Sequence, residues 1–349
     1  MSDALRTRSP LRVMGAGNTH IGSREHNEDS ILLRPDLDLY MVADGAGGHN
    51  AGNIASALAT TTVAHYFEST QDEAHSAPPY DGMGLSWAAR RLASAFQRAN
   101  REIIDVAGGS DHKRGMGTTL VAAYFDLPRS TLVLGHVGDS RCYRIREGRL
   151  ELLTQDHTLL NDVLELKPDI DADSAARLPR NVITNALGMD KSVRVSVRTY
   201  EIAAGDRYML CSDGLTDEVD DGQIGQALLV GGSPEEQVRL LIDLAAAEGS
   251  GARDNIAVVV LACSVAPGIG KLPQKPVPPR RAYPEDVDAQ VLLEMEIDGE
   301  DESVEVTVVE DPDDDDGPEL EIMEAKPASN VGKKKRSRRD ETVVSKTRS

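Results

Sequence analysis

Short apolar runs alternate with longer amphipathic stretches along this chain. Runs rich in β-branched and aromatic residues predict strands at 30–33, 39–43, 118–125, 131–137, 141–146, 150–153, 193–201, 207–212 and 255–263. Apolar spacing near 3.6 residues predicts helices at 51–68, 84–106, 157–166, 224–230 and 234–247. Consecutive strands separated by paired helices favour antiparallel sheets with segregated helices, so the predicted fold class is α+β.

The helix predicted at 84–106 is amphipathic. Its apolar positions would pack on a sheet. Its four arginines, Arg90, Arg91, Arg98 and Arg101, are expected on the solvent-exposed face.

Composition divides the chain into a folded part and a tail. The apolar run that ends at Cys263 is followed by six prolines within 267–284, which indicates an extended linker. Glu285–Glu324 then holds 19 acidic and no basic residues, and Ala325–Ser349 is basic. Like-charge blocks cannot bury a core. We therefore predict an N-terminal extension at 1–14, one folded domain at 15–265, a linker at 266–284 and a disordered acidic-then-basic tail at 285–349.

One stretch of the tail departs from this description. Val304–Val309 alternates in the manner of a strand, so it could be added to the sheet edge of a partner. The terminal basic cluster would suit nucleic acid or anionic lipid, but the adjoining acidic block opposes both. No nucleic-acid partner is expected, and nothing indicates an obligate interface, so a monomer is expected.

The three cysteines point to a reducing compartment. Cys142, Cys211 and Cys263 all lie within apolar runs and are unpaired by spacing, which favours reduced thiols and a cytoplasmic protein. No spacing typical of zinc ligands occurs. No apolar segment reaches the roughly 20 residues that span a bilayer, and the N-terminus lacks the apolar core of a secretory leader.

Four aspartates stand at the ends of predicted strands. Asp44 and Asp213 each end an apolar run and precede a glycine, Asp254 precedes the last strand, and Asp139 follows the strand at 131–137. Each alone would be an ordinary turn, since Asp-Gly is a common turn dipeptide. Their repetition indicates a site for a hard divalent cation, which takes carboxylate, carbonyl and water oxygens.

Two further segments carry groups suited to phosphate. Arg24 stands beside Glu28 and Asp29, and its guanidinium matches phosphate geometry, although a salt-bridged surface loop would look the same. Ala43–Gly52 is rich in glycine between a strand and a helix, which permits close backbone approach to a bound group. It lacks the Gly-Lys-Ser/Thr of a Walker loop. His136 is as well explained by the core as by function.

Taken in order, these segments resemble the type-2C metal-dependent Ser/Thr protein phosphatases, especially bacterial members. The resemblance covers Gly15 to about Ala262 and rests on motifs in the family's order: Arg24–Asp29, Val42–Gly52, Gly115–Thr119, His136–Tyr143, Leu153–His157, Asn181–Gly188, Cys211–Asp217 and Asp254 with Asn255. It implies a four-layer α-β-β-α sandwich with a central antiparallel β-sandwich and a binuclear metal site at one end.

The resemblance also assigns roles to residues of this chain. It implies that Asp44 bridges two Mn²⁺ or Mg²⁺ ions and that Asp213 and Asp254 complete the first site. The second would take the carbonyl of Gly45, with waters held by Glu28 and Asp29. Arg24 would clamp phosphate, and Asp139 with Asp213 would hold a third ion. Roles are thus implied for eight residues: Arg24, Glu28, Asp29, Asp44, Gly45, Asp139, Asp213 and Asp254.

The activity implied is hydrolysis of phospho-Ser and phospho-Thr by direct attack of a metal-bridging hydroxide, opposing Ser/Thr kinases. Two positions depart from the family pattern: Ala46 stands where some members have a histidine, and Asn185 where an arginine is common. The flap, at about 158–180, has a sequence of its own. Two alternatives stay open: a weakly catalytic phosphoprotein-binding adaptor that acts through its tail, and a hydrolase of small phosphate metabolites.

Overall fold

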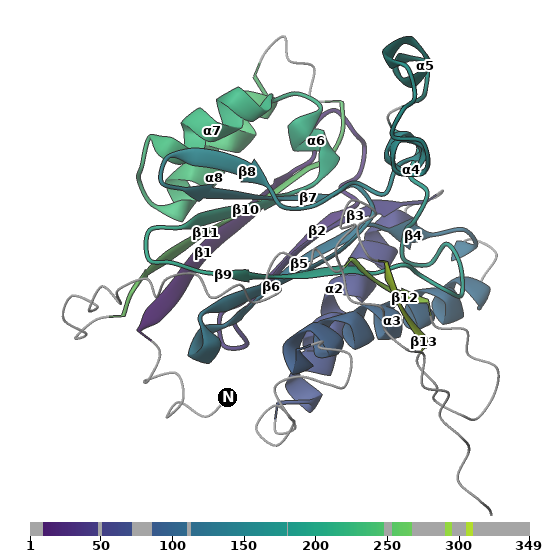
Figure 1. The fold of residues 1–349 in the computed structure, drawn as a ribbon, viewed down its shortest axis with the longest axis horizontal. Coiled ribbons are helices and arrows are strands. Elements are labelled where there is room, and N and C mark those ends of the chain that lie inside the picture. The colour runs from purple at the N-terminus through teal and green to yellow at the C-terminus, as the bar shows by residue number, and fades with distance from the viewer. Residues whose placement is uncertain are drawn as a thin grey trace, which may run out of the picture. The chain divides into compact units, whose positions relative to one another are not determined.

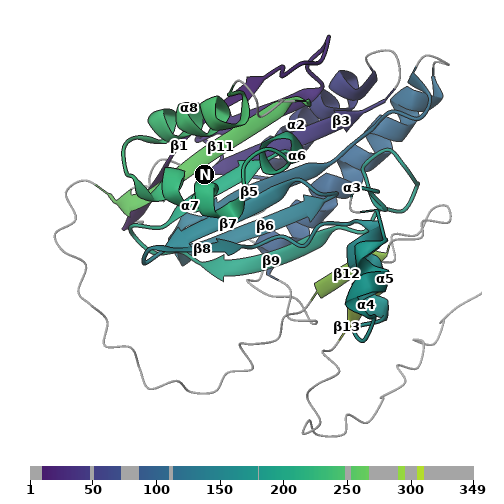
Figure 2. The same cartoon turned by 90° about the horizontal axis from the view of Figure 1, so that it is seen from above.

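The computed structural model describes residues 10–47, 51–71, 86–109, 113–179, 181–247, 253–266, 290–294 and 305–309. Its centre is a pair of antiparallel sheets (Figures 1 and 2). The first has the order β1-β11-β10-β7-β8, from Leu11–His20, Ile256–Val265, Arg207–Cys211, Arg141–Arg146 and Arg149–Leu152. The second has the order β2-β3-β5-β6-β9, from Asp29–Arg34, Leu39–Ala46, Leu120–Asp126, Thr131–Val137 and Ser196–Glu201. The short strand β4 (Gly117–Thr118) pairs with the end of β3.

Helices cover the two outer faces of this sandwich. Two long helices, α2 (Ala51–Ser69) and α3 (Trp87–Gly108), pack on the second sheet. Three others, α6 (Asp213–Thr216), α7 (Asp221–Leu229) and α8 (Pro234–Ala245), lie on the first sheet. Figure 1 shows the two helical layers on opposite sides of the sheets. The predicted α-β-β-α architecture is therefore confirmed.

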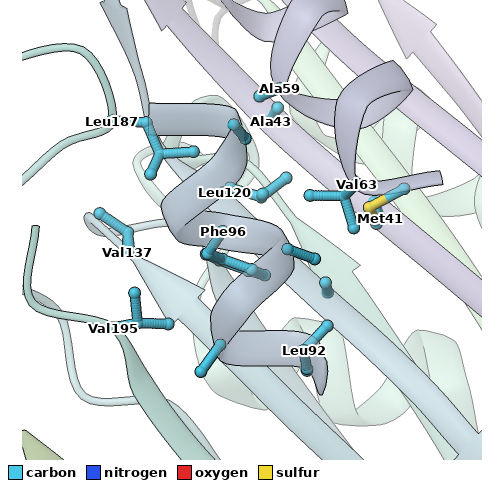
Figure 3. Packing of buried hydrophobic residues seen from close by; sticks show 14 of the residues in the cluster. Met41, Ala43, Ala59, Val63, Leu92, Phe96, Leu120, Val137, Leu187 and Val195 are labelled. Atoms are coloured by element: carbon cyan, nitrogen blue, oxygen red, sulfur yellow. The ribbon is translucent and has the colours of Figure 1, made fainter. Parts of the chain in front are cut away.

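Three apolar clusters fill the spaces between these layers. One lies between the sheets and includes Tyr40, Phe125 and Tyr208, whose rings meet edge to face. A second joins the second sheet to α2 and α3, and Figure 3 shows part of it, with Phe96 and Leu92 of α3 directed at the sheet. The third joins the first sheet to α7 and α8. Because strands β3, β10 and β11 are buried on both faces, they read as continuous apolar runs.

The side chain of Arg91 corrects one expectation. It is buried on α3 instead of lying on the exposed face, with its guanidinium carbon 4.1 Å from the ring centre of Phe67 and its Nε donating to Thr70 Oγ1 at 2.8 Å. Arg98 and Arg101 are exposed as expected. Arg91 lies at the edge of the buried face of α3, where the end of α2 covers it, and the ring of Phe67 and the hydroxyl of Thr70 offset the cost of burying its charge.

The ends of the domain differ in detail from the predicted boundaries. β1 begins at Leu11 and pairs with β11 along its whole length, so it includes 11–14, which were placed in an N-terminal extension. Glu305–Val309 (β13), within the stretch predicted to be a strand, pairs with Gln290–Glu294 (β12) of the same chain. Most of the predicted linker and tail lies outside the described residues.

The predicted flap contains two short helices, α4 (Leu159–Leu166) and α5 (Ala172–Ala176), which project from the sandwich in Figures 1 and 2. A short 3₁₀ turn, Leu127–Arg129, joins β5 to β6. Across the described part of the chain, no helix combines the length and apolar character needed to cross a membrane.

Candidate metal centre

A cleft of about 560 Å³ brings together residues from both sheets. Asp44 ends β3 in the second sheet, Asp213 follows β10 in the first, and Asp254 precedes β11. Six of the eight predicted site residues line this cleft: Arg24, Glu28, Asp44, Gly45, Asp213 and Asp254. The site therefore depends on the packing of the two sheets against each other.

The backbone of Asp44 is fixed by hydroxyl groups of the next strand. Thr118 Oγ1 and the Thr119 amide each donate to the Asp44 carbonyl at 2.8 Å. The Asp44 amide donates to Thr119 Oγ1 at 3.1 Å, and that hydroxyl is 2.7 Å from Ser140 Oγ. Since Ser140 follows Asp139, this network joins the strand ends that carry two of the predicted ligands.

Gly45 lies where the backbone of three segments converges. A Cβ at this position would meet the Gly52 carbonyl oxygen at 2.1 Å and the Glu28 carbonyl oxygen at 2.7 Å, so no larger residue fits. The Gly45 amide donates to the Glu28 carbonyl at 3.2 Å. Close packing of this kind holds the side chain of Glu28 against the first turn of α2.

Arg24 and Asp254 are held together on one side of the cleft. Arg24 Nη2 is 2.5 Å from Asp254 Oδ2, and Arg24 Nε donates to the Arg253 carbonyl at 3.0 Å. Asn255 ties this segment to the loop before β2: its Oδ1 accepts from the Glu28 amide at 2.8 Å, and its Nδ2 donates to the carbonyls of Ile21 and His26.

Asp29 and Asp139 do not line the cleft. Asp29 lies directly opposite Asp44 in the β2–β3 ladder, is buried, and accepts a hydrogen bond from Ser212 Oγ at 2.8 Å. Asp139 is buried at the turn between β6 and β7. Both are nevertheless part of one electrostatic cluster, because the charge of Asp213 acts on each of them.

Burial and the repulsion between neighbouring carboxylates raise the pKa values of the aspartates in this cluster. Burial raises the pKa of Asp29 to about 7. The hydrogen bond from Ser212 opposes this increase, and the charges of Asp213 and Asp254 add to it. Burial and the charge of Asp213 raise the pKa of Asp139 to about 7. The pKa of Asp44 is raised well above its usual value by burial and by the neighbouring aspartates, and burial also raises the pKa of Asp213. Several anions held this close favour a bound cation.

The donor atoms suit a hard cation. The cluster offers oxygen atoms alone, and two buried carboxylate oxygens, Asp29 Oδ1 and Asp213 Oδ1, have no hydrogen-bond partner among the described residues. Within the described ranges, no three acidic, His or Cys side chains already surround a single point in ligating geometry. Asp254 is instead held by Arg24, and Asp29 by Ser212, so a cation would have to displace or share these contacts.

Sequence reasoning missed the groups that position these ligands. The hydroxyls of Thr118, Thr119, Ser140 and Ser212 look like ordinary strand residues in the sequence. His136 is a core residue: it is buried with Nε2 2.7 Å from the Gln155 carbonyl oxygen, and burial lowers its pKa to about 4. The cleft also has an apolar side that the sequence did not reveal, formed by Met116, Ile183, Ala186 and Met189.

Comparison with known proteins identifies the family of this chain. The family model described as protein phosphatase 2C matches residues 16–233. The serine/threonine phosphatase stp of Listeria innocua is 32% identical over 242 residues, covering 68% of this chain and 90% of that protein. The serine/threonine protein phosphatase PstP of Mycobacterium tuberculosis is 36% identical over 239 residues, 68% of this chain and 42% of that longer protein.

Solved structures give the same answer for the fold. The catalytic domain of PstP in complex with two manganese ions is 33% identical, with a TM-score of 0.60 over 73% of this chain and 99% of that domain. The family model, the relatives and the solved structures all indicate one family. The chain therefore belongs to the protein phosphatase 2C family of serine/threonine phosphatases.

Proposed function

We propose that this phosphatase hydrolyses phospho-Ser and phospho-Thr in proteins by direct in-line attack of water on phosphorus, with two Mn²⁺ or Mg²⁺ ions held in the cleft. The observation that supports this most strongly is the convergence of Asp44, Asp213 and Asp254 beside Arg24 in one cleft. When bound, the ions would lower the pKa of a coordinated water and offset the charge of the phosphoryl oxygens.

The chain's own residues divide this work. Asp44, Asp213 and Asp254 would hold one ion, and Asp44 would be shared with a second near the Gly45 carbonyl. Glu28 and Asp29 would orient its waters, and Asp139 with Asp213 would hold a third ion. Arg24 would bind the phosphate oxygens, since its guanidinium is half-exposed to the cleft. The buried hydrogen bonds around Asp44 keep this arrangement rigid before substrate arrives.

A cysteine nucleophile does not fit the structure. The three cysteines are free and buried, and burial raises the pKa of Cys211 to about 12. A cysteine phosphatase needs an exposed thiolate of low pKa. The same free thiols support our proposal of a cytoplasmic location. The adaptor alternative would be expected to show lost ligands, and every predicted ligand is present.

We also propose that the enzyme acts as a monomer that opposes Ser/Thr kinases, and that the folded domain, predicted at 15–265 and extended to Leu11 by β1, carries the activity. A truncation after Ala266 is expected to keep its kcat on p-nitrophenyl phosphate. A large loss of kcat would show that the tail takes part in catalysis.

The decisive experiment compares turnover of p-nitrophenyl phosphate and a phosphothreonine peptide in metal-free buffer, Mn²⁺ and Mg²⁺. Asp213→Asn should lose about a thousandfold or more of the metal-dependent kcat. Asp243 lies on the exposed side of α8, so the control variant Asp243→Asn should keep the wild-type kcat. Equal turnover with and without metal, or full activity of Asp213→Asn, would overturn the proposal.

A further inference from the structure

The apolar side of the cleft points to a recognition site for substrate residues next to the phosphate. We propose that Ile183, Ala186 and Met189, which together with the buried Met116 are here called the apolar wall, bind a bulky apolar side chain within two positions of the phosphorylated Ser or Thr. This inference rests on the proposed function, because it names the class of protein substrate that the same cleft would take.

The cleft is divided by chemistry. Its acidic residues and Arg24 suit cations and phosphate, whereas the side chains of the apolar wall are uncharged and apolar, and both groups line the same cleft of about 560 Å³. Successive Cα atoms in a peptide are about 3.8 Å apart. A residue within two positions of the phosphorylated one therefore lies within about 7 Å of it, so one cleft can hold both.

Met189 is exposed although its backbone is fixed. Its side chain is 58% exposed. Its amide donates to the Ala186 carbonyl at 3.3 Å. The preceding amide, of Gly188, donates at 2.7 Å to Oδ1 of Asn100, a fully buried residue of α3. Asn100 Nδ2 also donates to the carbonyl of Asp190 at 2.9 Å. A loop whose backbone is fixed on both sides of an exposed methionine presents that side chain to a ligand without the cost of ordering the backbone.

Ile183 is fixed in the same way at the base of the flap. It forms a bridge with Thr158, the residue that precedes α4, and the Leu159 amide donates to the Val182 carbonyl at 2.9 Å. The Leu187 amide donates to the Thr118 carbonyl at 2.9 Å, and the Thr118 amide donates back to the Leu187 carbonyl at 3.0 Å. The apolar wall is thus hydrogen-bonded to β4, which carries the hydroxyl that fixes Asp44.

Single exposed apolar residues need no explanation, since they are common on protein surfaces. Here, however, Ile183 and Met189 line the same cleft as Arg24 and the acidic residues. Apolar surface that is rigid, concave and next to a reactive centre is typical of a ligand subsite. Burial of a substrate side chain against it would contribute to kcat/KM.

The test uses two phosphothreonine peptides that differ only at the flanking positions, one with leucine and the other with serine. The full-length wild type in Mn²⁺ should prefer the leucine peptide by about tenfold in kcat/KM. In Met189→Gln and in Ile183→Thr, this ratio should fall toward one. The control Leu229→Gln changes a residue that is 51% exposed on α7 and does not line the cleft, so it should keep the wild-type ratio.

Wild-type turnover of p-nitrophenyl phosphate distinguishes failure of the apolar recognition site from failure of the proposed phosphatase activity. If that turnover requires metal but the two peptides are hydrolysed equally, or if both cleft variants keep the wild-type ratio, the apolar wall is not a recognition site and the proposed function stands. If wild type shows no metal-dependent turnover, both proposals are overturned. Circular dichroism of each variant confirms that a lost preference is not a loss of fold.

Discussion

Arg24 and Asp254 form an ion pair in the cleft, with Nη2 and Oδ2 2.5 Å apart. The two residues are 230 positions apart in sequence, and the proposed function gives them different partners: phosphate for Arg24 and a cation for Asp254. A cation that binds Asp254 must therefore weaken this pair. Release of Arg24 would make its guanidinium available just as the metal centre is completed.

Removal of the Arg24 guanidinium should consequently increase the affinity for metal and decrease kcat/KM for the substrate. We expect Arg24→Gln to bind Mn²⁺ about two- to fivefold more tightly, because a half-exposed ion pair is worth up to about 1 kcal/mol. The same variant should lose about a hundredfold in kcat/KM on a phosphothreonine peptide, since it lacks a donor to the phosphate. Calorimetric titration with Mn²⁺ and steady-state kinetics measure the two effects.

A second ion pair of the same length provides the control for Arg24→Gln. Arg144 Nη2 is 2.5 Å from Glu151 Oε2 on β8, outside the cleft. Arg144→Gln should change neither Mn²⁺ affinity nor peptide turnover. Weaker Mn²⁺ binding by Arg24→Gln would show that Arg24 supports the metal centre instead of competing with it.

Asp29 should stabilise the metal-loaded protein and destabilise the metal-free one. Its carboxylate is buried, with Oδ1 unpartnered among the described residues, and it faces Asp44 across the strand pair. We expect Asp29→Asn to raise the metal-free free energy of unfolding by about 1 kcal/mol, because it removes a buried charge from an acidic cluster.

The same variant should gain less from metal. Saturating Mn²⁺ at about a hundred times its Kd would add about 2.7 kcal/mol to wild type, and Asp29→Asn should gain clearly less. Thermal unfolding with and without Mn²⁺ gives both quantities. A variant that is less stable without metal, yet gains as much as wild type from Mn²⁺, would place Asp29 outside the metal centre.

Gly138 allows the turn that presents Asp139. Its φ is +97°, and a Cβ would lie 2.6 Å from Thr119 Cγ2. Gly205 has nearly the same φ of +98° but open space around its Cβ position. Gly205→Ala should therefore cost about 1 kcal/mol of backbone strain. Gly138→Ala should cost about 3 kcal/mol, since the clash adds to that strain.

Urea unfolding of the two alanine variants measures these costs. Because Thr119 also accepts from the Asp44 amide, Gly138→Ala should in addition weaken Mn²⁺ binding, whereas Gly205→Ala should not. Equal losses of stability in the two variants would mean that the β6–β7 turn relaxes without disturbing Thr119.

A pair of buried histidines should make stability depend on acid. The rings of His136 and His157 stack with centroids 4.7 Å apart. Burial lowers the pKa of His136 to about 4, and burial together with His136 lowers that of His157 to about 2. A pKa that is lower in the folded state contributes stability that is complete above about pH 6.5 and is lost as pH falls through the folded value.

His136→Gln isolates this effect, because glutamine does not titrate. The free energy of unfolding of wild type relative to His136→Gln should decrease from pH 7.5 to pH 5 by about 2 kcal/mol, as the unfolded histidine takes up a proton that the folded one excludes. Urea unfolding at each pH gives this difference, and comparison with the variant cancels the titration of the acidic cluster. A difference that stays constant with pH would show that His136 is accessible to protons in the folded state.

The sequence predicts the candidate ligands better than it predicts the strands and hydroxyl groups that position them. Asp44 and Asp213 stand out because each ends a run buried on both faces, and such runs are visible in the pattern. β1 is not visible in the same way, since Gly15 and Gly17 interrupt its apolar pattern. The structure explains these glycines: a Cβ would lie 2.6 Å from Leu261 at Gly15 and 2.8 Å from Val259 at Gly17.

The apolar wall was unpredictable for a related reason. Met116 follows α3, whereas Ile183 and Met189 come from the segment after the flap, and only the pairing of Thr118 with Leu187 brings them together. No local pattern records such a pairing. Arg91 is a second such case, because the exposed Arg98 lies seven residues later on the same side of α3, and only the contacts with Phe67 and Thr70 at the end of α2 bury Arg91.

Substitution of Arg91 tests whether the buried contacts of this side chain stabilise the fold. Arg91 lies over Phe67, donates to Thr70 Oγ1 and also donates to the Phe67 carbonyl, so it joins the end of α2 to α3. We expect Arg91→Ala to lower the free energy of unfolding by about 3 kcal/mol, because it leaves a cavity and an unpaired buried carbonyl. Arg98→Ala, at an exposed position of the same helix, should change it by less than about 0.5 kcal/mol. Urea unfolding of both variants decides the matter, and similar small effects would mean that the Arg91 side chain is solvated in solution.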